Sequence, residues 1–234
     1  MLRTQNLAEA DRIITLLTHR NGLVRAVGKG VRRTRSRFGA RLEPFTHLDL
    51  QLHTGRSLDV VTQADTRRSY GAPLAGHYPG YTAGVAMLET AQKITVVEQE
   101  PVPQQFLLLI GGLRALGEGR HEPRLVLDAY LLRSLATAGY APALVECAHC
   151  GSHGRHRFFA IQAGGTVCGT CHSAGAATPA PQTLELMVAL LTGDWESADA
   201  SAARHRSECS GLVAAYLQWH LENGIRSLRL VERH

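Results

Sequence analysis

The stretch RIITLLTHRNGLVRAVGKG, residues 12–30, decides the fold of the first part of this chain. Residues 12–18 form a β-branched and apolar run that is typical of a strand, and residues 23–27 have the same character. Between them lies His19-Arg20-Asn21-Gly22, and an Asn-Gly pair flanked by two such runs is a strong turn signal. The stretch therefore predicts a β-hairpin that closes with Gly28-Lys29-Gly30.

A second hairpin is predicted further along the chain. Residues 45–52 alternate in polarity, so that one face carries Thr46, Leu48, Leu50 and Leu52 and the other carries Phe45, His47, Asp49 and Gln51. Residues 54–57 have turn composition, and residues 58–61 return as a strand that leads out through residues 63–65. Residues 1–4 supply the tail of a fifth strand. Five short strands that close into a small barrel are what an OB-fold requires.

After about residue 75 the hydrophobic period changes to that of a helix. Apolar residues recur at helical spacing over residues 81–96, 103–116, 124–138, 182–191 and 201–221, and residues 174–181 form an Ala/Gly/Pro linker. We therefore predict a multi-domain α+β protein. Residues 1–75 form an OB-fold nucleic-acid-binding domain, and residues 76–234 form an all-helical domain with a zinc-binding insertion at about 146–173.

Four cysteines carry the most specific chemical signal in the chain. They form two C-x-x-C pairs separated by 17 residues: Cys147, Cys150, Cys168 and Cys171. Each tight pair places two sulfurs on one side of a small cation, and two pairs complete a tetrahedron. Gly151 and Gly169 allow the backbone to turn sharply beside the sulfurs. The spacing predicts one structural Zn²⁺ ion, bound by all four thiolates.

Other interpretations of the cysteines fit less well. Disulfides require an oxidising compartment, and the charged N-terminal residues do not resemble a secretory signal peptide. A thioredoxin-like motif uses one C-x-x-C in a βαβ context, and a zinc deaminase requires an H-x-E motif that this sequence lacks. Cys209 stands apart and is interpreted as a buried helical residue. Unpaired thiols, a predicted metal site and no signal peptide indicate a cytoplasmic protein. The sequence has no run of 18 apolar residues, so no membrane span is predicted.

The net charge of +5 is unevenly distributed. Residues 1–70 contain 13 Lys or Arg against 6 Asp or Glu, whereas residues 71–234 contain 12 against 14. No acidic residue occurs between Asp11 and Glu43. A local positive excess of this kind is typical of a surface that binds a polyanion. The predicted DNA-binding residues are Arg20, Arg25, Lys29, Arg32, Arg33, Arg35, Arg37, Phe38 and Arg41.

The basic stretch allows other interpretations. A solvated charged loop is the simplest, and binding to acidic protein tails is a further functional one. Arginine binds phosphate oxygens bidentately and stacks on bases, which favours nucleic acid. Aromatic side chains for base stacking are scarce, with Phe38, Phe45, Tyr70, Tyr78 and Tyr81 as candidates, of which Phe45 suits the barrel core best. We therefore expect a mainly electrostatic, sequence-tolerant grip on DNA.

Three stretches together resemble the RecO family of bacterial recombination mediators. They are residues 9–18 (EADRIITLLT), residues 27–33 (VGKGVRR) and residues 36–45 (SRFGARLEPF), and the closing Tyr216-Leu217 followed by Trp219-His220-Leu221 agrees with them. The C-x-x-C pairs occur in many members. RecO-like chains usually begin several residues earlier, so the resemblance implies either a misassigned start or a shortened first barrel strand here.

The resemblance implies a non-enzymatic DNA repair and recombination function. RecO-like proteins bind single- and double-stranded DNA, anneal complementary strands and engage the acidic C-terminal tail of the single-strand binding protein SSB. With RecR, and with RecF, they help RecA to load onto SSB-coated DNA. They act in the bacterial cytoplasm at the nucleoid and have no small-molecule substrate. The sequence agrees, since it has neither a P-loop nor a recognisable pair of metal-nuclease carboxylates.

Two points remain open at the level of sequence. In an alternative function, the chain is a zinc-ribbon DNA-binding or regulatory protein whose cysteine segment, with Arg155 and Arg157, contacts DNA. A zinc enzyme is a third class, and it would need an open coordination position. The surface for the SSB tail is expected to combine apolar residues with basic ones, and the candidates are Arg114, Arg120, Arg124 and Arg133.

Overall fold

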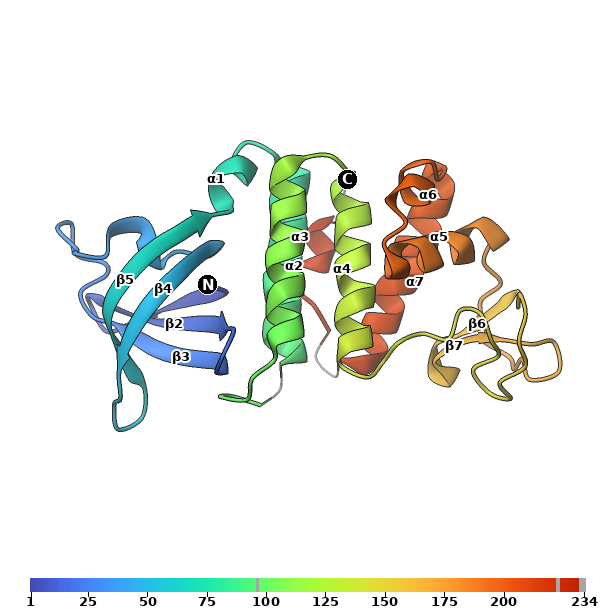
Figure 1. Ribbon diagram of the computed structural model, residues 1–234, viewed down its shortest axis with the longest axis horizontal. Coiled ribbons are helices and arrows are strands. Elements are labelled where there is room, and N and C mark those ends of the chain that lie inside the picture. The colour runs from blue at the N-terminus through green and yellow to red at the C-terminus, as the bar shows by residue number, and fades with distance from the viewer. Residues whose placement is uncertain (96, 222–223, 232–234) are drawn as a thin grey trace. The chain divides into compact units, whose positions relative to one another are not determined.

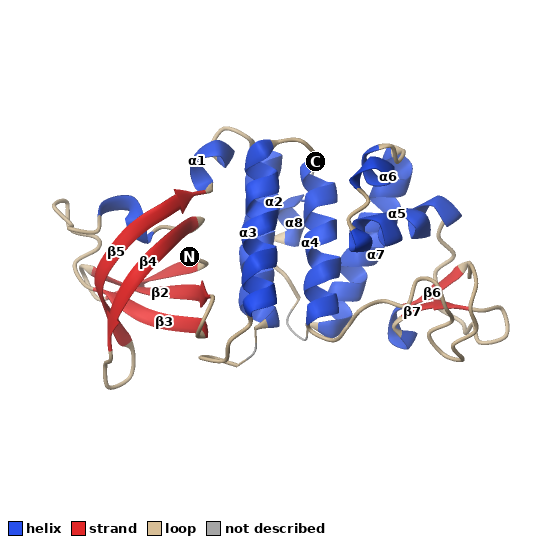
Figure 2. Ribbon diagram, in the orientation of Figure 1, coloured by secondary structure: helices blue, strands red, loops and turns tan. Residues whose placement is uncertain are grey.

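The computed structural model describes residues 1–95, 97–221 and 224–231. The chain divides into two compact units, Met1–Glu118 and Gly119–His234, here called unit 1 and unit 2. Figure 1 labels their elements. Strands dominate the first part of unit 1, and the remaining strands are a short pair in unit 2 (Figure 2). The division at residue 75 that the hydrophobic period suggests stays a prediction.

Unit 1 begins with an OB-fold barrel. Its five-stranded sheet has the order β1-β2-β3-β5-β4. The strands are β1 (Arg3–Leu7), β2 (Asp11–Thr18), β3 (Gly22–Gly28), β4 (Thr46–His53) and β5 (Asp59–Ser69). The sheet curls so that the Phe45 N–H donates to the carbonyl oxygen of Met1, 3.2 Å away, which brings the beginning of the chain beside β4. The α+β fold class predicted from the sequence is confirmed.

The first hairpin forms as its turn signal predicts. β2 pairs with β3 in antiparallel register, with Thr18 opposite Gly22 and Leu17 opposite Leu23. Inward-facing residues Ile14, Leu16, Val24 and Ala26 are buried in the barrel core, as period-two alternation requires. The second hairpin extends further than predicted, because β5 continues to Ser69 opposite Thr46.

Three helices complete unit 1. They are α1 (Gly71–Leu74), α2 (Tyr78–Ile94) and α3 (Pro103–Glu118). α2 begins three residues before the predicted start, with Pro79 in its first turn, where the absence of an N–H costs nothing. The predicted end at Val96 lies outside the described residues. The four-residue helix α1 is too short to show a period, so the sequence does not predict it.

Unit 2 packs helices around α4 and carries a small β-element. The helices are α4 (Pro123–Thr137), α5 (Pro181–Thr192), α6 (Trp195–Asp199), α7 (Ala203–His220) and α8 (Leu228–Val231). α4 is buried nearly all round, and it contacts both α5 and α7. The segment of the chain that connects α4 to α5 contains the antiparallel strands β6 (Phe158–Ala160) and β7 (Gly165–Val167). No helix within residues 1–95, 97–221 and 224–231 is long and apolar enough to cross a membrane.

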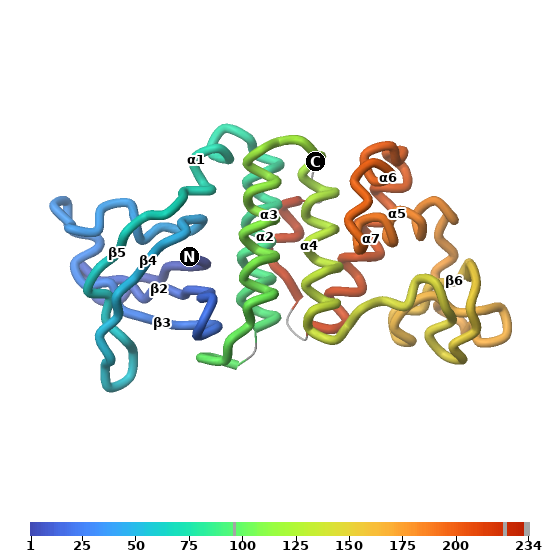
Figure 3. The backbone as a smooth tube through the Cα atoms, viewed as in Figure 1, coloured from blue at the N-terminus to red at the C-terminus, as the bar shows by residue number. Residues whose placement is uncertain are grey.

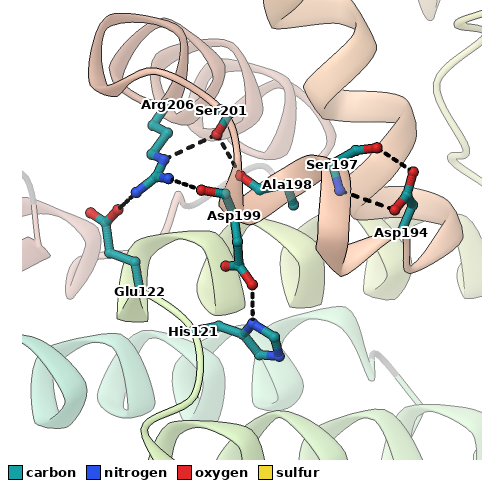
Figure 4. Close-up of polar contacts among 8 residues, drawn as sticks. All are labelled: His121, Glu122, Asp194, Ser197, Ala198, Asp199, Ser201 and Arg206. Carbon is teal, nitrogen blue, oxygen red and sulfur yellow. Dashed lines mark hydrogen bonds and ion pairs between the residues drawn. The ribbon is translucent and has the colours of Figure 1, made fainter.

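A polar network fixes the start of α4 to the corner between α6 and α7 (Figure 4). His121 Nδ1 lies 2.7 Å from Asp199 Oδ2, and Arg206 forms an ion pair with Glu122. The Arg206 guanidinium also donates to the Asp199 carbonyl oxygen at 2.6 Å and to Ser201 Oγ at 3.0 Å. The network therefore holds the start of α4 against the consecutive helices α6 and α7, which are more than 50 residues away in sequence.

A buried carboxyl group lies in the interface between α4 and α7. Asp128 is 4% exposed, and the Ser210 hydroxyl donates to its Oδ2 at 2.5 Å. Burial raises the pKa of Asp128 to about 7, against the lowering influence of Ser210 and of Arg124. The folded chain therefore holds a proton on Asp128 more tightly than the unfolded chain does.

We expect Asp128→Asn to remove a pH dependence of stability. Because the pKa of Asp128 is higher in the folded state, its contribution is complete below about pH 4 and is lost as the pH rises through about 7. The free energy of unfolding of the parent should fall by about 3 kcal/mol between about pH 5 and pH 8. Denaturant titrations across this range should show a shallower pH dependence in Asp128→Asn, and an unchanged dependence would contradict the assignment.

Candidate nucleic-acid interface and metal centre

The basic residues of unit 1 concentrate in the connection from β3 to β4, which Figure 3 traces. We call residues 29–41 the arginine loop. It is a series of turns that ends in the short 3-10 helix η1 (Gly39–Leu42). Val31, Phe38 and Leu42 are 8%, 2% and 0% exposed and belong to the barrel core. These apolar anchors fasten the loop to the barrel, so that the arginines between them project into solvent.

Polar contacts fix the beginning of the arginine loop to the turn between β1 and β2. The Gly30 N–H donates to Asp11 Oδ1 at 2.7 Å, and the Arg32 N–H donates to the Ala10 carbonyl oxygen at 3.0 Å. The Arg32 guanidinium donates to the Glu9 carbonyl oxygen at 3.0 Å. Gly30 has a φ of +66°, a conformation that glycine adopts without strain. The loop is therefore held at its base rather than free along its whole length.

The structure brings most, but not all, of the predicted DNA-binding residues together. All eight basic residues of the set are exposed. Lys29, Arg32, Arg33, Arg35, Arg37 and Arg41 share the arginine loop. Arg25 lies in the middle of β3, and Arg20 lies in the turn at the opposite end of this seven-residue strand. At about 3.3 Å per residue, Arg20 is roughly 20 Å along the strand from the loop.

Within the part of the chain that the structure describes, Lys29, Arg33 and Arg35 make no side-chain ion pair. Of the nearest acidic groups, Glu43 pairs with Arg12 at 2.6 Å and Asp11 accepts the Gly30 N–H. Arg41 is partly engaged, since its guanidinium donates to the Ala64 carbonyl oxygen at 3.1 Å. The loop thus presents positive charge that its own fold does not neutralise.

Phe38 corrects one prediction. Its ring is buried in the barrel core, and the Arg37 guanidinium lies over it with Cζ 4.7 Å from the ring centroid. A buried ring offers no free face to a base, so the structure places Phe38 as an anchor of the arginine loop rather than as a stacking platform. Phe45 is also core, as expected, and Tyr70 is 5% exposed. Of the five aromatic candidates, Tyr78 and Tyr81 on α2 are exposed, at 52% and 44%.

Phe38→Leu tests this reassignment. An apolar substitution should cost about 1 kcal/mol of stability through the smaller side chain and leave affinity for single-stranded DNA within about twofold. A stacking residue would instead lose about 1–3 kcal/mol of binding on removal of its ring. Fluorescence anisotropy with a labelled oligonucleotide distinguishes the two results, and thermal unfolding reports the stability.

In unit 2, the four predicted metal ligands converge. The sulfur atoms of Cys147, Cys150, Cys168 and Cys171 all lie within 4.8 Å of one another, and the Sγ atoms of Cys150 and Cys168 are 3.9 Å apart. We call residues 146–173 the cysteine knuckle. Cys147 is buried, Cys150 is exposed and the other two are intermediate. The geometry is compatible with a four-thiolate metal site, in which the protein leaves no ligand position open.

Two turns shape the cysteine knuckle. The Gly151 N–H donates to the Cys147 carbonyl oxygen at 2.8 Å, and Gly151 has a φ of +70°. In the second turn the Cys171 N–H donates to the Cys168 carbonyl oxygen at 3.2 Å. The Ala148 N–H bonds to the Thr166 carbonyl oxygen at 2.8 Å, which joins the first turn to the end of β7. Each C-x-x-C pair is thus held in place by backbone bonds.

Backbone donors also set the charge of the sulfurs. The Cys168 N–H donates to Cys147 Sγ at 3.4 Å, and with the Cys150 N–H it lowers the pKa of Cys147 to about 6. The pKa of Cys168 is lowered too, by the backbone N–H of Cys171. Hydrogen bonds among the sulfurs raise the pKa of Cys171 to about 12. Backbone donors that favour the thiolate form at Cys147 and Cys168 suit the binding of a soft divalent cation.

The four candidate basic residues for a protein partner belong to both units, Arg114 to unit 1 and Arg120, Arg124 and Arg133 to unit 2. Arg114 lies on α3 of unit 1 and pairs with Glu118 at 2.9 Å. Arg133 is turned inward, since its guanidinium donates to the Leu190 carbonyl oxygen at 2.8 and 3.0 Å and closes the end of α5. The Arg133 guanidinium is therefore engaged within unit 2. Arg120 precedes α4, and Arg124 lies in its first turn. Both stay candidates for binding a protein partner.

A groove that the sequence does not reveal runs between the cysteine knuckle and helices α5 to α7. Its volume is about 1290 Å³. Leu144, Val145 and Val188 contribute apolar surface, and Val145 is 65% exposed. Arg157 and Arg204 also line it, together with Arg155, which pairs with Glu185 at 2.7 Å. The groove combines an apolar wall with several guanidinium groups.

Comparison with known proteins agrees with both halves of this architecture. The family model described as "Recombination protein O N terminal" matches residues 1–70, and "Recombination protein O C terminal" matches residues 77–229. The chain belongs to the RecO family. Its RecO relatives span the whole chain, so the arginine loop and the cysteine knuckle both lie inside the family match.

Three RecO relatives illustrate this coverage. The chain is 74% identical over 233 residues to the DNA repair protein RecO of Thermobifida fusca, with 100% of this chain and 96% of the relative covered. It is 57% identical over 239 residues to the DNA repair protein RecO of Streptomyces griseus, and 58% over 236 residues to that of a Nocardioides species. Each alignment covers all of this chain and 96% or 97% of the relative. Membership of RecO indicates a role in DNA repair.

Proposed function

We propose that this chain is a non-enzymatic recombination mediator that binds single- and double-stranded DNA and anneals complementary strands. The observation that carries the proposal is the arginine loop, in which Lys29, Arg33 and Arg35 are exposed and without ion pairs among the described residues. Annealing requires that the repulsion between two polyanions be neutralised, and arginine side chains do this without a catalytic group. Family membership supports the same role.

The partners of this function are SSB, RecR and, through them, RecF and RecA. We propose that the chain helps RecA to load on SSB-coated single strands in the bacterial cytoplasm. The test is annealing of complementary oligonucleotides that are first coated with SSB. This protein should accelerate annealing of the coated strands. Adding RecR should accelerate annealing further or allow RecA to load on the coated strands. A chain that binds bare strands but leaves SSB-coated strands unannealed would contradict the mediator function.

We further propose Zn²⁺ as the ion of the cysteine knuckle, with a structural role. Four sulfur ligands on two tight turns fit a small tetrahedral cation, and four protein ligands leave no position for substrate. Zinc enzymes keep such a position open, so this donor set favours a structural site. X-ray absorption of the zinc-loaded chain should report four sulfur neighbours at about 2.3 Å.

The groove beside the cysteine knuckle is the proposed site for the acidic tail of SSB. Apolar side chains at Leu144 and Val145 and basic ones at Arg157 and Arg204 match a peptide that is both acidic and apolar. Arg204→Glu should weaken binding of a fluorescent tail peptide by about tenfold, since one charge-assisted contact becomes repulsive. Arg56→Glu, which changes an exposed charge that is neither in the groove nor among the four tail candidates, is the matched control. Equal losses in both variants would place the peptide elsewhere.

A further inference from the structure

The arginine loop contains two hydroxyl side chains within its densest run of charge. Residues 32–37 read Arg-Arg-Thr-Arg-Ser-Arg, so that Thr34 lies between Arg33 and Arg35. The buried anchors Val31 and Phe38 flank this hexapeptide and fix where it begins and ends. Between the anchors the backbone forms turns and belongs to neither a helix nor a strand. Drawing this segment into an extended conformation breaks the backbone hydrogen bond from the Ser36 N–H to the Arg33 carbonyl oxygen, 2.9 Å away, which closes the turn containing Thr34.

The two hydroxyl groups differ in accessibility. Ser36 is partly buried, and its Oγ accepts the Phe38 N–H at 3.3 Å, which ties it to the anchor. Thr34 is exposed, and its hydroxyl makes no hydrogen bond within the described residues. An enzyme could therefore reach the Thr34 hydroxyl without breaking a side-chain hydrogen bond, whereas the Ser36 hydroxyl would first lose its hydrogen bond to the Phe38 N–H.

We propose that Thr34 is a phosphorylation site that switches off the DNA-binding surface of the arginine loop. The proposal rests on the proposed DNA-binding function. The modifying enzyme is an ATP-dependent serine/threonine kinase whose acidic cleft recognises arginine on both sides of its target. In the reaction the threonine Oγ1 forms a bond to the γ-phosphorus of ATP, and the bond from this phosphorus to the bridging oxygen breaks. The hydroxyl proton passes to the base of the kinase, and ADP leaves.

The electrostatic consequence follows from what surrounds Thr34. A phosphothreonine carries a charge of about −1.5 to −2 at neutral pH and offers three strong acceptor oxygens. Its neighbours Arg33 and Arg35 have no ion pair among the described residues, so their guanidinium groups are available to it. A guanidinium group binds a phosphate through two parallel hydrogen bonds, whether that phosphate is on Thr34 or in the DNA backbone. The phosphate on Thr34 therefore competes with DNA for the same side chains.

The expected size of the effect follows from counterion release. If phosphothreonine occupies two arginines, about two contacts to DNA phosphates are lost, and the logarithmic salt slope for single strands falls by about 1.4. At about 0.1 M salt this corresponds to roughly 25-fold weaker binding. The barrel itself should keep its stability, because Thr34 is exposed and is not a member of the buried core.

The experiment uses the full chain in two parts. In the first, a kinase that selects arginine beside its target is supplied with ATP, and mass spectrometry locates the phosphate in the parent, Thr34→Ala and Ser36→Ala. One phosphate on Thr34, lost in Thr34→Ala and kept in Ser36→Ala, is expected. A phosphate on Ser36 alone, or none in residues 32–37, overturns the proposal.

In the second part, phosphothreonine is incorporated at position 34 during translation, and salt titrations measure DNA affinity. A chain with phosphothreonine at the exposed Thr54 is the control. Weaker binding and a shallower salt slope are expected for position 34 only. If the unmodified chain binds single strands and the chain phosphorylated at position 34 binds them equally well, the switch is wrong. If the unmodified chain does not bind at all, the DNA-binding function itself fails.

Discussion

Cys147→Ser is expected to lose the bound zinc and to unfold much of unit 2. Cys147 is the most buried of the four sulfur ligands, at 1% exposure, and its Sγ accepts the Cys168 N–H that links the two turns. Thiolate zinc sites contribute about 10–16 kcal/mol of apparent binding free energy, which serves as folding free energy. A serine oxygen is a poorer ligand, so a large part of this contribution should be lost. Metal analysis and thermal unfolding measure the two effects.

The control for this experiment is Cys209→Ala. Cys209 is fully buried on α7 and takes no part in the sulfur cluster. Its removal should cost about 1 kcal/mol as a small cavity and leave one zinc ion per chain. The thermal midpoint of unit 2 should fall by about 10 °C or more in Cys147→Ser and much less in the control. If Cys147→Ser keeps its zinc, or keeps the parent midpoint without zinc, the structural role is wrong.

The zinc prediction illustrates which features can be inferred from sequence. The spacing of Cys147, Cys150, Cys168 and Cys171 is a local signal, because each pair needs only one tight turn to present two sulfurs. The hairpin of β2 and β3 is equally local, since Asn21-Gly22 specifies the turn and the flanking alternation specifies the buried face. In both cases residues close in the chain determine the geometry. The hairpin and the convergence of the four sulfur atoms are confirmed, and Zn²⁺ as the ion stays a proposal.

Features that depend on packing between distant residues were not predictable in this way. Phe38 beside Arg37 has the sequence character of a base-stacking site, and only the barrel core reveals that its ring is an anchor. Arg133 resembles a surface residue, but the end of α5 provides a carbonyl acceptor for it. The buried Asp128 depends on Ser210, 82 residues away. Tertiary contacts determine the positions of these side chains, and no local sequence pattern predicts such contacts.

The anchors also change how the DNA surface should be tested. Arg32 and Arg41 donate to main-chain carbonyl groups, so replacing them would disturb the loop as well as its charge. Among the described residues Arg33 and Arg35 make no such contact, and the Arg37 guanidinium lies over the Phe38 ring without donating to a carbonyl group. A charge change confined to these three separates the electrostatic role of the loop from its fold, which reversal of the whole cluster would not do.

The triple variant Arg33→Glu, Arg35→Glu, Arg37→Glu is expected to lose at least about 10²-fold in affinity for single-stranded DNA at about 0.1 M salt. Removing three contacts to phosphate lowers the logarithmic salt slope by about 2, and the added carboxylates repel the backbone further. The rate of strand annealing should fall by a similar factor, because neutralisation of the second strand depends on the same charges. Anisotropy titrations at several salt concentrations give both quantities, and circular dichroism checks that the barrel is intact.

A matched triple variant in unit 2 decides between the two DNA-binding hypotheses. Arg155→Glu, Arg157→Glu and Arg204→Glu change the net charge by the same amount on the cysteine knuckle and its groove. If the arginine loop binds DNA, this variant should keep most of the affinity and nearly the whole salt slope, because it leaves every phosphate contact of the loop in place. If instead the unit 2 variant loses affinity and the loop variant does not, the cysteine knuckle is the DNA-binding surface.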